Sequence, residues 1–184
     1  MYDVFIRNLK YKQNYKDKWK SSLDLDIDDN DWNLINMNVT KITQDTTLRW
    51  LQYRIIHRCI GTNNMLFRFN MLSSNLCTFC NENPETILHL FCDCKHVEKF
   101  WKDLELWLFR NCNIQITFSK NDICLMKKMY KNQHLFNLII ILAKKHIYKQ
   151  KLNKSKPTIG MFLIELKSYL TLLKNQYIFT KRNT

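Results

Sequence analysis

The stretch SNLCTFCNENPETILHLFCDCKH, residues 74–96, decides the fold of this 184-residue chain. Cys77 and Cys80 are separated by two residues, so both thiolates can reach one ion from a tight turn. His89 and then Cys94 follow at spacings that complete a Cys3His set. Three thiolates bind hard cations poorly, and a full tetrahedral shell leaves no position for water. We therefore expect one structural zinc ion per chain, bound by a small knuckle.

The identity of the last ligand stays open when only the residues are considered. On one continuous α-helix His89, Cys92 and His96 share a face, at spacings i, i+3 and i+7. Cys94 would then point about 140° away from His89. Cys94 can bind the same ion only if the helix ends or tightens after His89. Cys92 and His96 are therefore competing ligands.

The composition predicts a mostly α-helical fold. The chain has two glycines and two prolines, whereas an all-β protein needs many tight turns. Gly61 and Gly160 are too far apart for a dinucleotide fingerprint, a Walker-A loop or a nucleophile elbow. We expect an irregular helical domain around the Cys3His zinc knuckle, with either a short β excursion or a loop near residues 113–119.

The length fits one domain, or one domain with an appendage. Changes in charge and hydropathy along the chain suggest three parts. Residues 1–45 form a basic and then acidic N-terminal segment, residues 46–110 an arginine-rich helix with the zinc-binding domain, and residues 111–184 a basic helical C-terminal region.

The stretch TTLRWLQYRIIHRCI, residues 46–60, has helical periodicity. One face carries Leu48, Leu51, Ile55 and Cys59. The opposite face carries Arg49, Trp50, Arg54, His57 and Arg58. Guanidinium groups can pair with phosphates and an exposed indole can stack on a base, so this face is a candidate nucleic-acid surface, with a merely solvated face as the alternative. We expect the helix to end at Gly61, and Asn63 to cap a short helix after it.

The net charge of +13 favours a polyanionic partner, with nucleic acid the first candidate. Residues 120–184 hold fourteen basic residues but only two acidic ones, Asp122 and Glu165. Six lysines near a predicted helix and the break after it are candidates for phosphate contacts that do not read sequence. They are Lys144, Lys145, Lys149, Lys151, Lys154 and Lys156. A solvated face is again the alternative.

The chain resembles the C-terminal zinc-binding segment of non-LTR (LINE-type) retrotransposon reverse transcriptases. The likeness rests on TLRWLQYRIIHRCIGTNNMLF, then CTFC, PETILHLFCDC and KFW. It extends from Thr46 through LIIILAKKHIYKQKLNKSKPT and FLIELKSYL, and so covers the greater part of the chain.

The resemblance implies that the metal ligands are Cys77, Cys80, His89 and Cys94, because Cys92 falls where the family has an apolar or aromatic residue. It also implies RNA or DNA as the partner, held during target-primed reverse transcription, and a reverse transcriptase body supplied in cis or in trans.

We expect no enzymatic activity from this chain. A polymerase palm needs two or three carboxylates that hold two metal ions, and the adjacent pair Asp28 and Asp29 lacks that context. The alternative functions are a structural module that packs on a polymerase body and a decayed retroelement fragment.

No signal peptide is visible at the N-terminus, and the longest apolar run, residues 138–143, is too short to span a membrane. We therefore expect an intracellular protein with reduced thiols and no membrane partner, with the choice between nucleus and cytoplasm left open.

Overall fold

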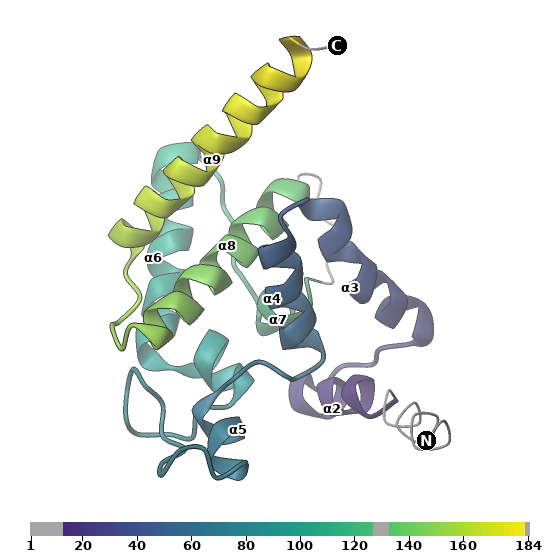
Figure 1. Cartoon of the computed structure of the whole chain (residues 1–184), viewed down its shortest axis with the longest axis vertical. Helices are drawn as coiled ribbons and strands as arrows, with labels where there is room; N and C mark the ends of the chain where they lie inside the picture. Colours follow the sequence, from purple (N-terminus) through teal and green to yellow (C-terminus); the bar gives the residue numbers. More distant parts are fainter. Residues whose placement is uncertain (1–12, 127–132, 183–184) are drawn as a thin grey trace.

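The structure, a computed structural model, describes residues 13–126 and 133–182, which form an assembly of helices (Figure 1). In chain order these are α2 (Gln13–Leu23), α3 (Asp29–Ile42), α4 (Thr46–Ile56), α5 (Asn63–Arg68), the π-helix η2 (His89–Asp93), α6 (Lys95–Cys112), α7 (Lys120–Leu125), α8 (Gln133–Leu152) and α9 (Ile159–Arg182). No strand forms within these two ranges, although an isolated β-bridge joins Leu76 and Pro84. The predicted mostly α-helical fold is confirmed.

Helix α8 is the centre of the fold. It contacts α3, α4, α7, η2 and α9, and Figure 1 shows it between α6 on one side and α4 on the other. Ile140, Ile141 and Ala143 in its middle are buried. The apolar run at residues 138–143 needs cover on most sides, and the surrounding helices provide it.

One hydrophobic cluster includes residues from all three parts into which the sequence was divided. It contains Trp19 and Ile35 from the first part, Leu48 and Phe100 from the second, and Phe162 from the third. The division into three parts stays a prediction, and the structure shows that the parts share a core.

The arginine-rich helix is shorter than the sequence predicts. Helix α4 ends at Ile56 instead of near Gly61, and Arg58 has a left-handed backbone conformation, with φ 51°. The carbonyl oxygen of Ile56 accepts a hydrogen bond from Trp19 Nε1 at 2.8 Å. The chain therefore turns away from the helix axis at this point, and Cys59, which the periodicity placed on the buried face, is exposed.

The next helix, α5, is capped by Thr62 and not by Asn63. The Thr62 hydroxyl accepts a hydrogen bond from the backbone N–H of Met65 at 3.3 Å. The predicted cap is thus one residue too late. Thr62 has the extended backbone of an N-cap residue, whereas Asn63 is already helical.

Residues 113–119 form a loop, so the β excursion does not exist. The backbone N–H of Ile114 donates to the carbonyl oxygen of Leu108, and that of Phe118 donates to Glu105 Oε1 at 2.7 Å. These groups pair with α6, the helix that precedes the loop. Within the described part of the chain, no neighbouring strand forms a ladder with them.

The acidic pair near residue 28 supports the entry of helix α3. The Asp28 side chain accepts a hydrogen bond from the backbone N–H of Asp31 at 2.7 Å and so caps the helix. Asp29 forms an ion pair with Lys16 at 2.5 Å. Both carboxylates therefore have structural roles at the helix start.

Helix α9 packs against α6 and α8 and then extends away from the body of the molecule (Figure 1). Phe162 and Leu166 near its start are buried, whereas Leu170 and Leu172 farther along are exposed. Among the helices of the described ranges, α9 included, none is both long enough and apolar enough to cross a membrane.

Candidate metal centre

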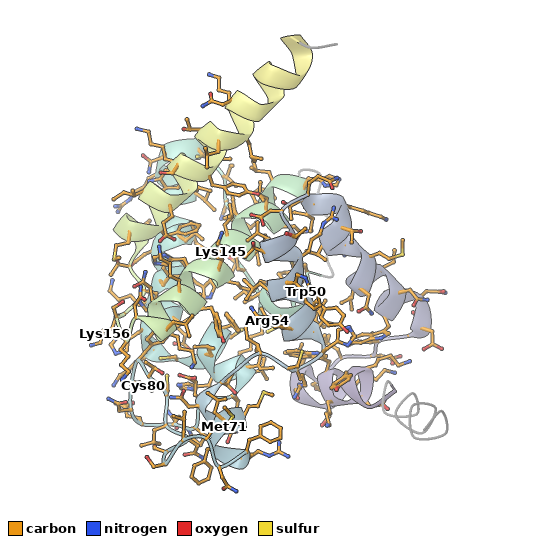
Figure 2. All side chains as sticks on the ribbon, viewed as in Figure 1. Trp50, Arg54, Met71, Cys80, Lys145 and Lys156 are labelled. Carbon is orange, nitrogen blue, oxygen red and sulfur yellow. The ribbon has the colours of Figure 1, made fainter. Side chains whose placement is uncertain are left out.

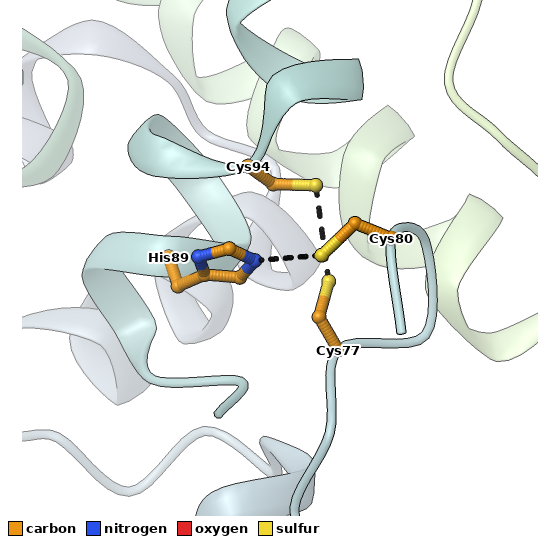
Figure 3. A group of neighbouring side chains, drawn as sticks. All are labelled: Cys77, Cys80, His89 and Cys94. Carbon is orange, nitrogen blue, oxygen red and sulfur yellow. Dashed lines mark hydrogen bonds between the residues drawn. The ribbon is translucent and has the colours of Figure 1, made fainter. Parts of the chain in front are cut away.

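Cys77, Cys80, His89 and Cys94 lie together around one point (Figure 3). Their ligand atoms are all within 4.8 Å of one another. The Sγ atoms of Cys77 and Cys94 are 3.8 Å apart, and Sγ of Cys80 lies 3.3 Å from Nε2 of His89. The structure therefore brings together the four side chains that the spacing grouped.

A tight turn positions the first two sulfurs. The backbone N–H of Asn81 donates to the carbonyl oxygen of Cys77, and Asn81 has a left-handed φ of 55°. The N–H of Phe79 points at the Cys77 sulfur at 3.4 Å. The turn thus holds both thiols on one side and supplies a backbone donor that favours the thiolate.

The π-helix η2 brings Cys94 to the same side as His89. The backbone N–H of Cys94 donates to the carbonyl oxygen of His89, five residues earlier, at 3.0 Å. A turn closed by an i to i+5 hydrogen bond is wider than an α-helical turn, so position i+5 comes back toward position i. The backbone of Cys94 is then extended, with ψ 128°, and the helix direction changes there.

The two competing ligands do not join the group. Sγ of Cys92 lies 3.7 Å from Sγ of Cys124 on α7, and both side chains are buried. His96 lies in the first turn of α6, and the only cluster of metal-ligand type found within the described residues is the set of four. Cys92 belongs to the core because the wide turn directs it to the opposite side.

The distance between the sulfurs of Cys77 and Cys94 fits a tetrahedral ion. A tetrahedron built with metal–sulfur distances of about 2.3 Å has edges of about 3.8 Å between sulfurs. That value equals the distance between Cys77 Sγ and Cys94 Sγ. Cys77, Cys94 and His89 are buried, which leaves little access for water. The group can hold a metal ion as a closed structural site.

A hydrogen bond couples the two buried thiols of Cys77 and Cys94. The Cys77 thiol donates to the Cys94 sulfur; this hydrogen bond, with burial, raises the pKa of Cys77, and the same hydrogen bond lowers the pKa of Cys94. Thiol ligands lose their protons when they bind a metal ion, so metal binding at this group would release protons.

Glu85 is a structural residue of this region that was not predicted from the sequence. Its carboxylate is fully buried and accepts hydrogen bonds from the backbone N–H groups of Asn63 and Thr78, both at 2.9 Å. Lys151 Nζ lies 3.3 Å from the same carboxylate. Glu85 therefore joins the knuckle to α5 and α8. The only feature of the sequence that could have pointed to Glu85 is the Glu-Thr pair in PETILHLF.

The arginines predicted to face nucleic acid make contacts within the protein. Arg49 donates to the carbonyl oxygens of Thr43 and Thr40. The guanidinium of Arg58 lies 4.2 Å from the centre of the Trp19 ring, and that of Arg54 lies 5.8 Å from the Tyr148 ring. These contacts fix the junctions of α4 with α2, α3 and α8.

Two aromatic residues of α4, Trp50 and Tyr53, remain more accessible than the arginines. Trp50 is 62% exposed, and its position on the surface of α4 is visible in Figure 2. His57 is half-buried, and its ring lies 4.1 Å from that of Tyr53.

Two of the six candidate lysines are inside the protein, so they cannot contact a phosphate. Lys144 is fully buried, with Nζ hydrogen-bonded to Oε1 of Gln52, and Lys151 is buried against Glu85. The burial of these two lysines was not predicted, because it depends on how other helices cover α8. Lysines on the covered faces of α8 lie within the core.

The other four lysines are exposed. Lys149 forms an ion pair with Glu165 at 2.7 Å. Lys145 lies on the surface of α8 and Lys156 on the connection that follows it (Figure 2). Lys154 is exposed in the same connection. Lys145, Lys154 and Lys156 are the lysines of the set that can reach a phosphate without breaking an ion pair.

Comparison with known proteins places the metal group in a family segment. Residues 11–101 match the family model described as zinc-binding in reverse transcriptase. The match begins well before Thr46 and ends before α8 and α9. Searches of the curated proteins and of the solved structures gave no significant match. Residues 11–101 are thus similar to the zinc-binding segment of reverse transcriptases, and all four side chains of the Cys3His group lie within that similarity.

Proposed function

We propose that this chain is a zinc-stabilised, nucleic-acid-binding accessory domain of a LINE-type reverse transcriptase, from the C-terminal part of such an enzyme. The observation that carries the proposal is the Cys3His group inside the segment that matches zinc-binding in reverse transcriptase. The domain supplies binding and not catalysis. Its adjacent carboxylates, Asp28 and Asp29, cap a helix and pair with a lysine.

Zinc is the metal that fits the donor set. Three sulfurs and one imidazole nitrogen suit a borderline-soft ion, and the observed spacing suits tetrahedral coordination. With all four positions filled by protein, the ion polarises no substrate. Its role is to hold the knuckle between α5 and α6.

Nucleic acid is the partner that the charge favours. The chain carries a net charge of +13, and Lys145, Lys154 and Lys156 present exposed ammonium groups on and just after α8. Lysines bind phosphates as point charges without reading sequence. A reverse transcriptase works on RNA and DNA strands, and these polyanions are the partners that a basic accessory domain of the enzyme would bind.

The experiment is the salt dependence of binding. A labelled single-stranded RNA is titrated with the full chain at salt concentrations from about 50 to about 200 mM. We expect binding that weakens steeply with salt. The triple variant Lys145→Gln, Lys154→Gln, Lys156→Gln is expected to lower the slope of log K against log salt by about 2, since each single-strand phosphate contact adds about 0.7.

The matched control removes the same charge from another surface. Lys99→Gln, Lys102→Gln and Arg110→Gln change exposed residues of α6. This triple variant should leave the slope nearly unchanged. Equal losses in both variants would show that only net charge matters, and the absence of binding at low salt would refute nucleic-acid binding altogether.

A second candidate function rests on the projecting part of helix α9. Leu170, Leu172 and Leu173 are exposed there, and a hollow of about 460 Å³ beside Trp107 is lined almost wholly by apolar atoms. Such a surface fits docking on the polymerase body. It predicts that the isolated chain self-associates through α9. Light scattering should then show a monomer after Leu170→Gln with Leu173→Gln, but not after Leu152→Gln, an exposed residue at the end of α8.

A further inference from the structure

A hollow between helices α3 and α4 has the composition of a base-binding pocket. Its volume is about 250 Å³. Buried Val39 and Ile56 belong to its lining, together with the exposed rings of Trp50 and Tyr53 from α4. Most of the lining surface is apolar, as in pockets that accept a flat aromatic ligand.

The two rings are accessible and adjacent. Trp50 is 62% exposed and Tyr53 49% exposed, and their ring centres are 5.4 Å apart in an edge-to-face arrangement. Tyr53 is in turn 4.1 Å from the ring of His57. Single exposed aromatic residues are common, but a connected row of rings beside a hollow is a surface for stacking.

Polar groups stand beside the apolar lining. Arg49 is fixed by hydrogen bonds from Nε to Thr43 and from Nη2 to Thr40 and Gln44. These three bonds leave Nη1, with two N–H donors, for a ligand. Asn36 donates its amide to the carbonyl oxygen of Trp32, so its Oδ1 atom can accept. A base has both acceptors and donors on its edges, which these groups match.

The charge around the hollow suits the phosphates on either side of a base. Among the described residues, no carboxylate lines it. A second hollow, whose lining includes residues 41–45 from the connection between α3 and α4, is also lined by the exposed lysines Lys41 and Lys145. Asp45 also lines that second hollow, but its carboxylate is engaged as the cap of α4, 2.8 Å from the N–H of Thr47.

We propose that the hollow between α3 and α4 binds one unpaired base of a single-stranded nucleic acid, stacked on Trp50 and Tyr53, with the adjoining phosphates at Lys41 and Lys145. The inference rests on the proposed nucleic-acid binding and deepens it. The guanidinium of Arg49 serves as a fixed edge of the pocket and not as a free phosphate clamp. An apolar protein side chain is the other occupant that the lining could accept, but it leaves Asn36 Oδ1 and Arg49 Nη1 without a partner.

The test compares two strands that differ only in their bases. One is oligo(dT) of about 12 nucleotides, a length within the site sizes of single-strand binders. The other has the same phosphates and abasic sugars throughout. Binding of each labelled strand to the full chain is measured by fluorescence anisotropy at low salt. We expect the strand with bases to bind at least about tenfold more tightly, as stacking on an aromatic platform requires.

Variants then show which residues cause the preference for the strand with bases. Trp50→Ala should reduce it to within about twofold while leaving the salt dependence unchanged, and Trp50→Phe, which keeps a ring, should retain most of it. The matched control is Phe109→Ala, an exposed aromatic residue of α6, which should bind as the parent does. Circular dichroism verifies that each variant is folded, as the exposure of both positions predicts.

The outcomes separate the two proposals. Equal binding of both strands by the parent would overturn the base pocket and leave phosphate-driven binding intact. A Trp50→Ala variant that keeps the preference for bases would also overturn the pocket. Failure of the parent to bind either strand at low salt would overturn both proposals. Both proposals are supported if the parent strongly prefers the strand with bases and, among the variants, only Trp50→Ala loses that preference.

Discussion

The backbone N–H of Cys94 donates to the carbonyl oxygen of His89 at 3.0 Å, five residues back along the chain. This single hydrogen bond marks the wide turn that puts the Cys94 sulfur beside the imidazole of His89. In an α-helix the residue facing His89 would be Cys92. The local helix type thus selects the fourth ligand of the candidate metal centre.

Metal content is expected to follow that geometry. Cys77→Ser and Cys94→Ser each remove a sulfur from the group and should reduce the zinc content of purified protein from about one ion per chain to near zero. Cys92→Ser should retain the ion, because Cys92 contacts Cys124 instead. Elemental analysis of the four proteins decides the point. Loss of zinc in the Cys92 variant alone would mean that the helix is a regular α-helix.

Metal removal is expected to loosen the knuckle and leave the central helix ordered. Helix α5 has no buried residue, so we expect the metal ion and polar contacts, such as that of Asn63 with Glu85, to supply much of the stability of residues 63–88. Helix α8 has extensive apolar cover. In hydrogen-exchange mass spectrometry, a chelator should abolish protection in residues 63–88 and leave that of α8 largely in place. Uniform loss of protection would show that the ion stabilises the whole domain.

Glu85→Gln is expected to destabilise the protein by about 3–5 kcal/mol, the usual effect of removing one partner of a buried ion pair. The amide cannot accept from both Asn63 and Thr78 as the carboxylate does, and the buried ammonium of Lys151 loses its counter-charge. Urea denaturation measures the loss.

The matched control is Glu82→Gln, which removes a carboxylate that pairs with Lys95 on the surface. Its effect should stay within about 0.5 kcal/mol. A double-mutant cycle with Lys151→Met should give a coupling energy well above that of an exposed pair. If Glu85 and Glu82 behave alike, the buried carboxylate does not join the knuckle to α8.

Lys144→Met is expected to stabilise the protein in mildly acidic solution. Burial lowers the pKa of Lys144 from its ordinary value of 10.5 to about 7. Between these two values the unfolded chain binds a proton that the folded chain does not, so the free energy of unfolding of the parent rises with pH. Below a pH of about 7 the folded protein contains a buried ammonium and the penalty is complete.

The variant removes this penalty together with its pH dependence. At about pH 6 the gain should be about 1–4 kcal/mol, and at about pH 10 it should vanish or reverse, because the hydrogen bond to Gln52 is lost. Urea denaturation at the two pH values measures the difference. The control is Lys145→Met, the exposed neighbour, which should leave the pH dependence as in the parent.

The helices and the ligand group follow from local patterns, whereas the roles of the basic residues do not. Apolar periodicity correctly places Leu48, Leu51 and Ile55 in the core. It fails at Cys59, because the hydrogen bond from Trp19 to Ile56 belongs to a contact with α2 that the sequence of α4 does not encode. A distant residue therefore decides where the arginine-rich helix ends.

The same limit applies to the candidate site residues. The sequence does not distinguish an exposed lysine, such as Lys145, from a buried one, such as Lys144. Only the packing of α3, α4, α7 and α9 around α8 separates them. Arg49 and Arg58 likewise have their partners on α3 and α2. Trp50 keeps its exposed position because no described helix packs over it.

The sequence by itself determined the helical class and grouped Cys77, Cys80 and His89 as metal ligands, because both depend on short-range spacing. It left the fourth ligand open, and the π-helix of the structure selected Cys94. Helical period, scarcity of glycine and the interval between ligands are all fixed within a few residues. The tertiary structure alone decided that Glu85 and Lys151 form a buried pair, and that a stacking surface with Trp50 opens between α3 and α4. Burial and pocket shape depend on which helices pack together, and that contact information is spread over the whole chain.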